Sequence, residues 1–429
     1  MTVVRAFRAV RYDTDRVDLS RVIVPPYDVI AADERASFYD RDRHNAIRLE
    51  LVKDVADEAG TDYSEVAETL SGWLDDGVLR RDDGPALYVM RQRYTAPDGR
   101  TLERTGFFAE LGLENYEDRI VRPHERTLAG PKADRLKILR ATRANLSSVF
   151  MLYEDREQAI ASVLASAFEG EGVQSAKDPA GVEYTLARLD DPEAVSRVAG
   201  FLADRPVVIA DGHHRYETAL AYRDQMRESQ PDAGPEAPFE STLAYFANAY
   251  APGSLLLPIH RVIVDAPSPE ESVWRERLPG WQTKSVPLPG VDALPDLLAE
   301  HLEPLSGRPS FAADDGGGTL RIFWRDESLG DELMVRIAER DVIGQVFDIE
   351  PEAIRQGAVA FPKSALRAAR DVREGQGSVA LYLNPMTPDD VFATTGRGEV
   401  MPQKSTFFYP KIPTGLVFRV HDRPGDTGS

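Results

Sequence analysis

The alternation of apolar and polar positions predicts a chain that mixes helices with strands. Residues 86–111 alternate and carry Pro-Asp-Gly near their centre, which predicts a β-hairpin. Residues 194–229 have the pattern of a helix, a strand, a turn and a second helix, and residues 134–155 that of a helix running into a strand. Residues 67–81 and 157–172 have helical spacing, and a glycine ends the second of them. This mixture predicts the α/β (α+β) class.

Proline and glycine indicate where further elements begin and end. Residues 21–24 resemble a short strand before the rigid pair Pro25-Pro26, and a helix is expected to begin near residue 28. The run Asp-Asp-Gly-Gly-Gly at 314–318 predicts the turn of a second hairpin. The segment 401–418 contains too many prolines for a helix.

Composition and charge narrow the possible functions. The chain has 429 residues, 42% hydrophobic and 28% charged, which predicts a globular protein of two or three domains. It has no cysteine, which excludes disulfides, thiolate metal sites and a cysteine nucleophile. The net charge of −20 disfavours nucleic acid as a partner. No apolar run is long enough for a membrane span and the N-terminus lacks a signal region, so we expect no membrane partner and a cytoplasmic location.

The stretch VVIADGHHRYETALAYRDQM, residues 207–226, has the strongest chemical signal. A β-branched run predicts a buried strand, Asp211-Gly212 predicts a turn, and a helix follows. The first amides of a helix have no partner within the helix, and the helix dipole adds partial positive charge there. Because His213, His214 and Arg215 stand at this point, the stretch predicts a phosphate-type anion site. An arginine here opposes the dipole, which favours a bound anion that offsets it.

Two other interpretations of the stretch remain open at this point. In the first, the Asp211 side chain caps the helix by accepting from backbone amides and the histidines pair locally. In the second, the histidines bind a metal ion. Adjacent side chains such as those of His213 and His214 diverge, so they do not easily chelate one ion, and further ligands would be needed.

The motif ADGHHRYETAL resembles the nucleotide-binding turn of the ParB/sulfiredoxin superfamily, whose strand–turn–helix carries Gly-x-x-Arg. Its form Asp-Gly-His-His-Arg is most similar to that of the ParB-like free-serine kinases. Those kinases also have an upstream Pro-His-Glu element, which matches Pro123, His124 and Glu125. Over its length the chain resembles a widespread bacterial family known only as a domain of unknown function. That resemblance rests on the segments VPPYDVI, PHERT, KADRLKILRATRANLS, DGHHRYETAL, LPIHR and MPQKSTFFYPK.

The resemblance implies a small-molecule kinase that transfers phosphate from ATP or ADP, with Mg²⁺, to a hydroxyl group, most plausibly that of free L-serine. It assigns Glu125 as general base, His124 to charge stabilisation and Asp211 to Mg²⁺ binding or acceptor orientation. Gly212, His213, His214 and Arg215 would bind the phosphates. The implied segments are an N-terminal α/β region at 1–115, a ParB-like nucleotide-binding core at 116–265 and a C-terminal α/β region at 266–429.

The segment between the two motifs is longer than in the compact kinases, which implies an insertion around 130–195. The sequence alone therefore leaves open the distance between Glu125 and the turn at 211–215. The oligomeric state is also open, and a homodimer is one expectation.

Two further groups of basic residues are candidates for nucleotide binding. Lys132, Arg135 and Arg143 lie in one stretch, and the eight-residue spacing of the two arginines predicts one helix face. They would complete a phosphate clamp or form a solvated cationic face. Lys404 and Ser405 stand on a proline-bounded loop that either closes over a ligand or anchors a C-terminal strand.

Three other side chains have both a structural and a functional interpretation. Tyr27 and Asp28 follow the proline pair and fit either equally well, whereas His260 after an apolar run is more typical of a core histidine.

Two rival functions remain at this stage. One is a nucleotide-binding switch that binds CTP or ATP without transferring phosphate. The other is a metal-dependent hydrolase that uses the histidines.

Overall fold

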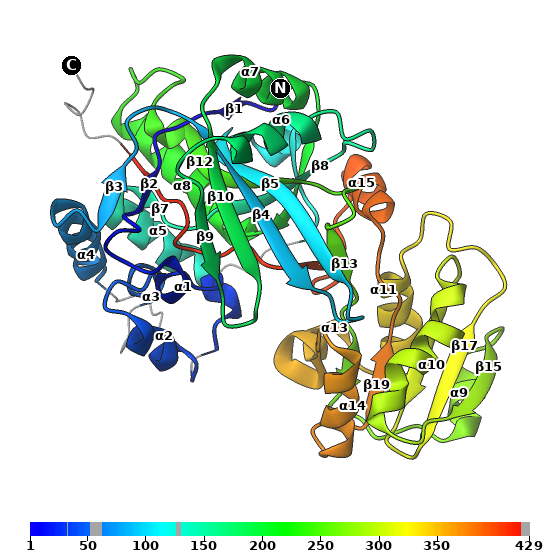
Figure 1. Ribbon diagram of the computed structural model, residues 1–429. Helices are drawn as coiled ribbons and strands as arrows, with labels where there is room; N and C mark the ends of the chain where they lie inside the picture. The colour runs from blue at the N-terminus through cyan, green and yellow to red at the C-terminus, as the bar shows by residue number, and fades with distance from the viewer. Residues whose placement is uncertain (32, 52–61, 126–129, 422–429) are drawn as a thin grey trace. The chain divides into compact units, whose positions relative to one another are not determined.

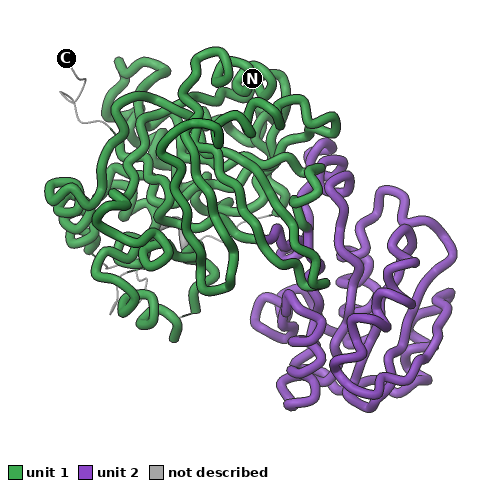
Figure 2. The backbone as a smooth tube through the Cα atoms, viewed as in Figure 1, with its two compact units in different colours: residues 1–255, 410–429 green, residues 256–409 purple. Residues whose placement is uncertain are grey.

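A computed structural model describes residues 1–31, 33–51, 62–125 and 130–421, and within α5 it describes no side chain before residue 134. The chain forms two compact units, which Figure 2 colours separately. Unit 1 comprises Met1–Leu255 and Pro410–Ser429, and unit 2 comprises Leu256–Tyr409. The end of the chain thus returns to the unit in which it began.

Unit 1 is built on a mixed sheet that has nine strands in the described part of the chain. The strand order is β6-β11-β8-β12-β5-β4-β10-β9, and β1 pairs with β5. Figure 1 shows β10, β4 and β5 side by side in this sheet. The pairs β6–β11 and β8–β12 are parallel, and the remaining pairs are antiparallel. The strands of unit 1 are β1 (Val4–Arg5), β2 (Val10–Tyr12), β3 (Leu79–Arg81), β4 (Leu87–Thr95), β5 (Thr101–Gly112), β6 (Val121–Pro123), β7 (Ala144–Asn145), β8 (Val149–Tyr153), β9 (Gln174–Lys177), β10 (Glu183–Leu189), β11 (Val207–Asp211), β12 (Ser241–Asn248) and β21 (Arg419–Val420).

One face of this sheet forms the main hydrophobic core of unit 1. Val89, Phe107 and Phe246 lie in it, and the two phenylalanine rings stack with centroids 5.1 Å apart. Apolar residues of α6, α7 and α8 pack on the same core, which removes both them and the sheet from water. The helices of unit 1 are α1 (Leu19–Val22), α2 (Arg35–Arg41), α3 (Ile47–Glu50), α4 (Ser64–Asp75), α5 (Gly130–Thr142), α6 (Ala161–Ser166), α7 (Pro192–Ala203) and α8 (His213–Ser229).

The C-terminal segment is bound to the sheet by two buried polar side chains. Gln92 on β4 and Arg104 on β5 are both fully buried, and the Arg104 guanidinium donates to Gln92. Gln92 Nε2 donates to the carbonyl of Lys411 at 3.1 Å, and Arg104 donates to the carbonyl of Pro410. Because buried polar groups need such partners, these bonds fix the course of the chain after residue 409.

Unit 2 contains a six-stranded antiparallel sheet in the order β15-β17-β16-β19-β14-β18. Residues of α10 and α14 complete its hydrophobic core. The strands of unit 2 are β14 (Arg261–Ile263), β15 (Gln282–Pro287), β16 (Ser310–Asp314), β17 (Thr319–Trp324), β18 (Val359–Ala360), β19 (Val379–Tyr382) and β20 (Phe407–Tyr409), and β13 (Leu255–Leu257) spans its beginning. Its helices are α9 (Glu271–Arg277), α10 (Leu294–His301), α11 (Met334–Ile337), α12 (Gln345–Phe347), α13 (Pro351–Ala353), α14 (Ala365–Arg373) and α15 (Pro388–Gly396).

The structure confirms the α/β class and most of the predicted elements. The hairpins at 86–111 and around 314–318 form β4–β5 and β16–β17, and residues 194–229 form α7, β11 and α8. The sheet of unit 1 contains strands from before and after residue 115, the predicted boundary. The assignment of 116–265 as a nucleotide-binding core therefore stays a prediction.

Three local predictions need correction. Residues 21–24 do not form a strand, because Leu19–Val22 form a helical turn that the Asp18 side chain caps by accepting from the amide of Ser20. The helix expected from residue 28 begins at Arg35. The helix expected over 157–172 is shorter and covers Ala161–Ser166 before a 3₁₀ turn.

No helix in the described ranges has the length and apolar character needed to cross a membrane.

Candidate functional site

The predicted strand–turn–helix is present at residues 207–229. Strand β11 ends at Asp211, Gly212 is the N-cap residue, and α8 begins at His213. Gly212 has φ +85°, in the left-handed region that glycine adopts without strain. A Cβ at this position would also lie 2.9 Å from Arg215 Nε. The turn therefore requires glycine both for its backbone conformation and for the close approach of Arg215.

The upstream Pro-His-Glu element lies directly beside this turn. Strand β6 pairs in parallel with β11, and Pro123 is opposite Ile209. His124 is buried, and its Nδ1 bonds the carbonyl oxygen of Ile209. Since a carbonyl only accepts, Nδ1 carries the proton. The long segment between the two motifs thus leaves His124 and Glu125 next to residues 211–213.

His124 and His213 contact each other through both rings and backbone. Their ring centroids are 4.7 Å apart, and the backbone amide of His124 donates to His213 Nε2 at 3.4 Å. Burial, with the neighbouring His124, lowers the pKa of His213 to about 3. His213 is therefore neutral near pH 7 and can offer a ligand one hydrogen bond from Nδ1, but no charge.

Glu125 is the carboxylate nearest to this histidine pair along the chain. Its Oε1 lies 3.4 Å from His124 Nε2, and 19% of its side chain is exposed. A carboxylate in such a position, partly open to solvent and in contact with an imidazole, can accept a proton from a substrate hydroxyl.

Asp211 lies between two cations. Lys411 Nζ is 3.1 Å from Asp211 Oδ1, and Arg215 Nη2 is 3.4 Å from Asp211 Oδ2. Burial raises the pKa of Asp211, but Lys411 and Arg215 lower it by more, so the net pKa is well below the usual range. Asp211 is thus ionised at neutral pH. The structure shows its side chain in contact with Lys411 and Arg215, whereas the capping alternative required it to accept from the first amides of α8.

The proline-bounded segment at 25–30 brings a second carboxylate to the turn. Asp28 Oδ2 lies 3.9 Å from Arg215 Nη2. Burial and the charge of Asp211 raise the pKa of Asp28, which means that the two carboxylates repel each other. Asp28 and Asp211 together offset the unfavourable position of Arg215 at the helix N-terminus.

Tyr27 and Arg135 extend this network away from the turn. Arg135 lies 4.2 Å from the centre of the Tyr27 ring, and burial raises the pKa of Tyr27 to about 12. Arg135 binds Asp134 at 2.9 Å and Glu50 at 3.2 Å. Its charge is thus already paired with two buried carboxylates.

Arg135 and Arg215 line the same cavity, which has a volume of about 50 Å³. Glu50 and Thr218 also line it. Arg135 therefore lies beside Arg215, and its part in phosphate binding stays a prediction.

The other two basic residues of that segment are placed differently. The side chain of Lys132 is outside the described part of the chain. The expectation that Arg135 and Arg143 share a helix face is wrong, because α5 ends at Thr142. Arg143 is exposed and has φ +49°, so it belongs to the turn after the helix.

Lys404, Ser405 and His260 all lie in unit 2. Lys404 is exposed with φ +59°, and Ser405 Oγ donates to the carbonyl of Pro402 at 2.6 Å. Their part in ligand binding remains a prediction. His260 is buried, and its Nδ1 accepts from the amide of Leu383, as expected of a core histidine.

Sequence reasoning missed three charged members of the site, namely Lys411, Glu50 and Asp134. Lys411 carried a weak signal, since it follows a proline in the same C-terminal segment as Lys404. Glu50 and Asp134 are acidic residues in helical stretches, a pattern that usually indicates a solvated surface.

Comparison with known families identifies the chain. Residues 4–281 match the family described as "Protein of unknown function (DUF1015)". The chain belongs to the DUF1015 family. This confirms the resemblance to a family of unknown function, and the match contains the turn, the Pro-His-Glu element and Tyr27-Asp28 but ends before Lys411. No curated protein matches the chain.

Several solved structures are similar to it at low identity. A conserved hypothetical protein from Pyrococcus furiosus is 14% identical, with a TM-score of 0.34, over 73% of this chain and 95% of that one. A variant of a free serine kinase in complex with ADP is also 14% identical, with a TM-score of 0.35, over 72% and 92%. SbnI from Staphylococcus aureus, with a C-terminal truncation, is 11% identical, with a TM-score of 0.34, over 73% and 87%.

Among the residues that the structure describes, no three histidine, aspartate or glutamate side chains are grouped to hold a metal ion. The turn instead has a pair of carboxylates, Asp28 and Asp211. Arg215 lies near both of them, and Lys411 contacts Asp211.

Proposed function

We propose that this DUF1015 protein is a small-molecule kinase that transfers the terminal phosphoryl group of a nucleotide to a hydroxyl, with free L-serine as the preferred acceptor. The observation that carries this proposal is the contact between the two motifs. Glu125 and His124 adjoin a glycine turn whose helix N-terminus and cations, Arg215 and Lys411, suit phosphate oxygens.

The residues divide into a phosphate-binding group and a proton acceptor. The first amides of α8, with Arg215 and Lys411, would bind and orient the phosphates, since phosphoryl transfer depends mainly on positioning and charge stabilisation. Glu125 would accept the hydroxyl proton as the acceptor oxygen bonds to phosphorus and the bond to the leaving nucleotide breaks. His124 Nε2 lies 3.4 Å from Glu125 Oε1, so both side chains would stand at the acceptor hydroxyl.

A magnesium ion is compatible with the carboxylates present. Mg²⁺ commonly binds through one or two carboxylates together with substrate phosphates. Burial and the charge of Asp211 raise the pKa of Asp28, and the second effect means that the two carboxylates repel each other. Asp211 would hold the ion. The charge of the ion would also offset that of Asp28, the second carboxylate. When bound, Mg²⁺ would neutralise phosphate charge.

Asp211 is held by Lys411 and Arg215. These cations keep its carboxylate ionised.

The test is incubation of the purified protein with Mg²⁺ and ATP, ADP or CTP, together with single amino acids, followed by mass spectrometry of the products. The proposal expects a phosphorylated amino acid, phosphoserine first, and a nucleotide shortened by one phosphate. A nucleotide that binds by calorimetry without any product would favour the switch. Absence of both binding and product with all three nucleotides would reject the kinase.

A further inference from the structure

The cavity that Arg135 and Arg215 line, called the Glu50 cavity below, contains polar atoms that the proposed chemistry does not use. Glu50 and Thr218 line it and are only 3% and 4% exposed. Within the described part of the chain, neither Glu50 Oε1 nor Thr218 Oγ1 has a hydrogen-bond partner. A buried polar group without a partner costs free energy of folding, so an acceptor and a hydroxyl at one cavity point to a ligand that bonds to them.

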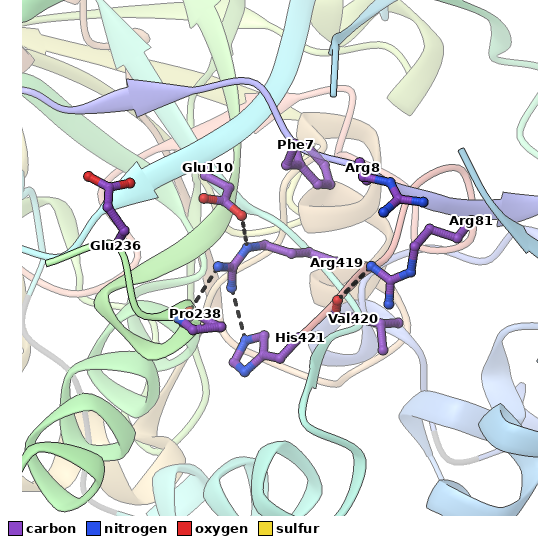
Figure 3. A pocket seen from close by; sticks show the side chains of 9 residues that line it. All are labelled: Phe7, Arg8, Arg81, Glu110, Glu236, Pro238, Arg419, Val420 and His421. Carbon is purple, nitrogen blue, oxygen red and sulfur yellow. Dashed lines mark hydrogen bonds and ion pairs between the residues drawn. The ribbon is translucent and has the colours of Figure 1, made fainter. Parts of the chain in front are cut away.

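A larger cavity of unit 1, the cavity at Arg419, differs in this respect. It has a volume of about 180 Å³, and Arg8 and Arg81 also line it. Figure 3 shows the Arg419 guanidinium bonded to Glu110, Pro238 and His421. Because these bonds already use the central guanidinium, we assign no ligand to this cavity.

The Glu50 carboxylate is held in place through its other oxygen. Arg135 Nη1 lies 3.2 Å from Glu50 Oε2 and donates to the backbone carbonyl of Glu50 at 2.9 Å. Arg135 Nη2 binds Asp134 at 2.9 Å, which fixes the guanidinium in turn. Glu50 Oε1 is therefore a charged acceptor that is already oriented before a ligand binds.

Thr218 differs from two other buried threonines in helices. Thr142 of α5 and Thr395 of α15 each donate from Oγ1 to the carbonyl four residues earlier, at 2.8 Å, as helical threonine commonly does. In the described chain, Thr218 makes no such bond to the carbonyl of His214. Its hydroxyl thus remains available to a group in the cavity.

The Glu50 cavity lies one helical turn along α8 from the end at which the proposed function places the phosphates. Arg215 and Thr218 are three residues apart, so they share a face of the helix and are separated by about 4.5 Å along its axis. Arg215 contacts Asp211 at the turn and also lines the cavity. A ligand with its phosphates at the turn would therefore bring the atoms next to those phosphates to the cavity.

The size and charge of the cavity limit which part of a nucleotide can enter. Its volume is about 50 Å³, and one water-sized group needs about 10–15 Å³, so two hydroxyls fit but a nucleobase does not. Arg135 and Arg215 disfavour an ammonium group there, and Glu50 disfavours an anion. Neutral hydroxyl groups suit it best. In a nucleotide, the ribose carries two hydroxyls and is joined to the phosphates through a single methylene group.

We propose that the Glu50 cavity binds the ribose hydroxyls of the nucleotide, with Glu50 Oε1 accepting from one hydroxyl and Thr218 Oγ1 bonding to the other. Acidic side chains hold ribose hydroxyls in the same way in other nucleotide sites. The inference rests on the nucleotide binding of the proposed function but not on phosphoryl transfer. It predicts that the protein selects ribonucleotides over deoxyribonucleotides.

The experiment is calorimetric titration of the full-length protein, with Mg²⁺, with ADP and its 2′-deoxy and 3′-deoxy analogues, and with the corresponding cytidine diphosphates. One of the two analogues loses the bond to Glu50. It should bind about tenfold more weakly than the ribonucleotide, because a hydrogen bond to a charged group has about this effect. The other analogue loses a bond to the Thr218 hydroxyl and should bind about fivefold more weakly.

Two variants connect this preference to the cavity. Glu50→Gln keeps an oxygen for Arg135 but removes the charged acceptor, and Thr218→Val removes the hydroxyl but keeps the shape of the side chain. Each should weaken binding of the ribonucleotide and bring one analogue to within about twofold of it, as expected when both partners of one bond are removed in turn. The exposed Glu68→Gln and Thr101→Val are the matched controls and should keep the wild-type preference.

Thr218→Val carries the test if Glu50→Gln does not fold by circular dichroism. Removal of a buried hydroxyl that has no partner in the described chain should leave stability to urea unchanged or raise it. Equal affinity of the wild type for the ribonucleotides and all their analogues would overturn the proposal. A preference that persists unchanged in both cavity variants, or no binding of either ribonucleotide, would also overturn it.

These outcomes are separate from that of the kinase assay. A ribose preference that depends on Glu50 and Thr218, without any phosphorylated product, would support this site and reject phosphoryl transfer. Phosphorylation that uses a nucleotide and its deoxy analogues equally would support the kinase and reject this site.

Discussion

The turn at 211–215 and the cavity at Arg419 both gather cations in an acidic protein, but they differ in their carboxylates. At the turn, Arg215 and Lys411 both contact Asp211, and Arg215 also lies near Asp28. At the cavity, Arg8 and Arg81 are oriented by carbonyl oxygens, and the lining carboxylates bind other arginines.

This difference bears on the chemistry that each region can perform. Paired cations and carboxylates, with Glu125 beside them, can bind phosphate and also move a proton or hold a divalent ion. We therefore expect phosphoryl transfer at the turn.

The largest expected effect concerns the proton acceptor at the turn. Glu125→Gln keeps the shape of the carboxylate but cannot accept a proton at neutral pH, so phosphoryl transfer should fall by roughly 10²–10⁴-fold. Nucleotide affinity should stay nearly unchanged, because phosphate binding depends on residues 211–215 and Lys411. The measurement pairs a nucleotide Kd with a serine phosphorylation rate.

The exposed Glu117→Gln is the control for this variant. A retained rate in Glu125→Gln would mean that Glu125 is structural and that Asp211 becomes the next candidate base. Loss of affinity together with rate would mean that Glu125 supports the fold or a metal instead.

A smaller effect is expected at the cation that the sequence did not reveal. Lys411→Met removes the positive group 3.1 Å from Asp211 and should weaken nucleotide binding about tenfold, as loss of a charge-assisted bond does. Lys411→Arg should restore most of the affinity. The exposed Lys177→Met, whose lysine binds Glu183, is the control.

A nucleotide Kd that does not change in Lys411→Met would remove Lys411 from the phosphate-binding group and weaken the contrast between the two regions.

The smallest expected effect tests the positive field of the cavity through pH. The pKa of His421 in the folded protein is well below that of the unfolded chain, because of burial and the nearby arginines. As pH falls below about 6.5, the unfolded chain therefore binds a proton that the folded protein does not, and stability decreases. His421→Gln removes this group, so its stability should fall less between pH 7 and pH 5.

Urea unfolding of both proteins at the two pH values measures the difference. Equal losses of stability in wild type and variant would show that His421 is protonated in the folded protein and that the cavity is not strongly positive.

The sequence by itself determined the local parts of this protein. Asp-Gly between a β-branched run and an amphipathic stretch is sufficient for the strand, the left-handed glycine and the start of α8, because neighbouring residues decide these features. The same holds for the hairpins β4–β5 and β16–β17. The local pattern gave a wrong prediction at residues 21–24. A strand was expected there, but the Asp18 side chain caps a helical turn at Leu19–Val22.

Only the tertiary structure decided which of these parts form one site. The parallel pairing of β6 with β11 brought Glu125 to the turn across more than eighty residues, and no local pattern specifies such a pairing. Buried Arg104 and Gln92 hold the C-terminal backbone at Pro410 and Lys411, which brings a lysine from the end of the chain to Asp211. Arg143 does not share a helix face with Arg135, because α5 ends one residue before it, at Thr142. Hydrogen bonds between distant strands and the pairing of buried charges set these positions, and both depend on contacts that exist only in the folded chain.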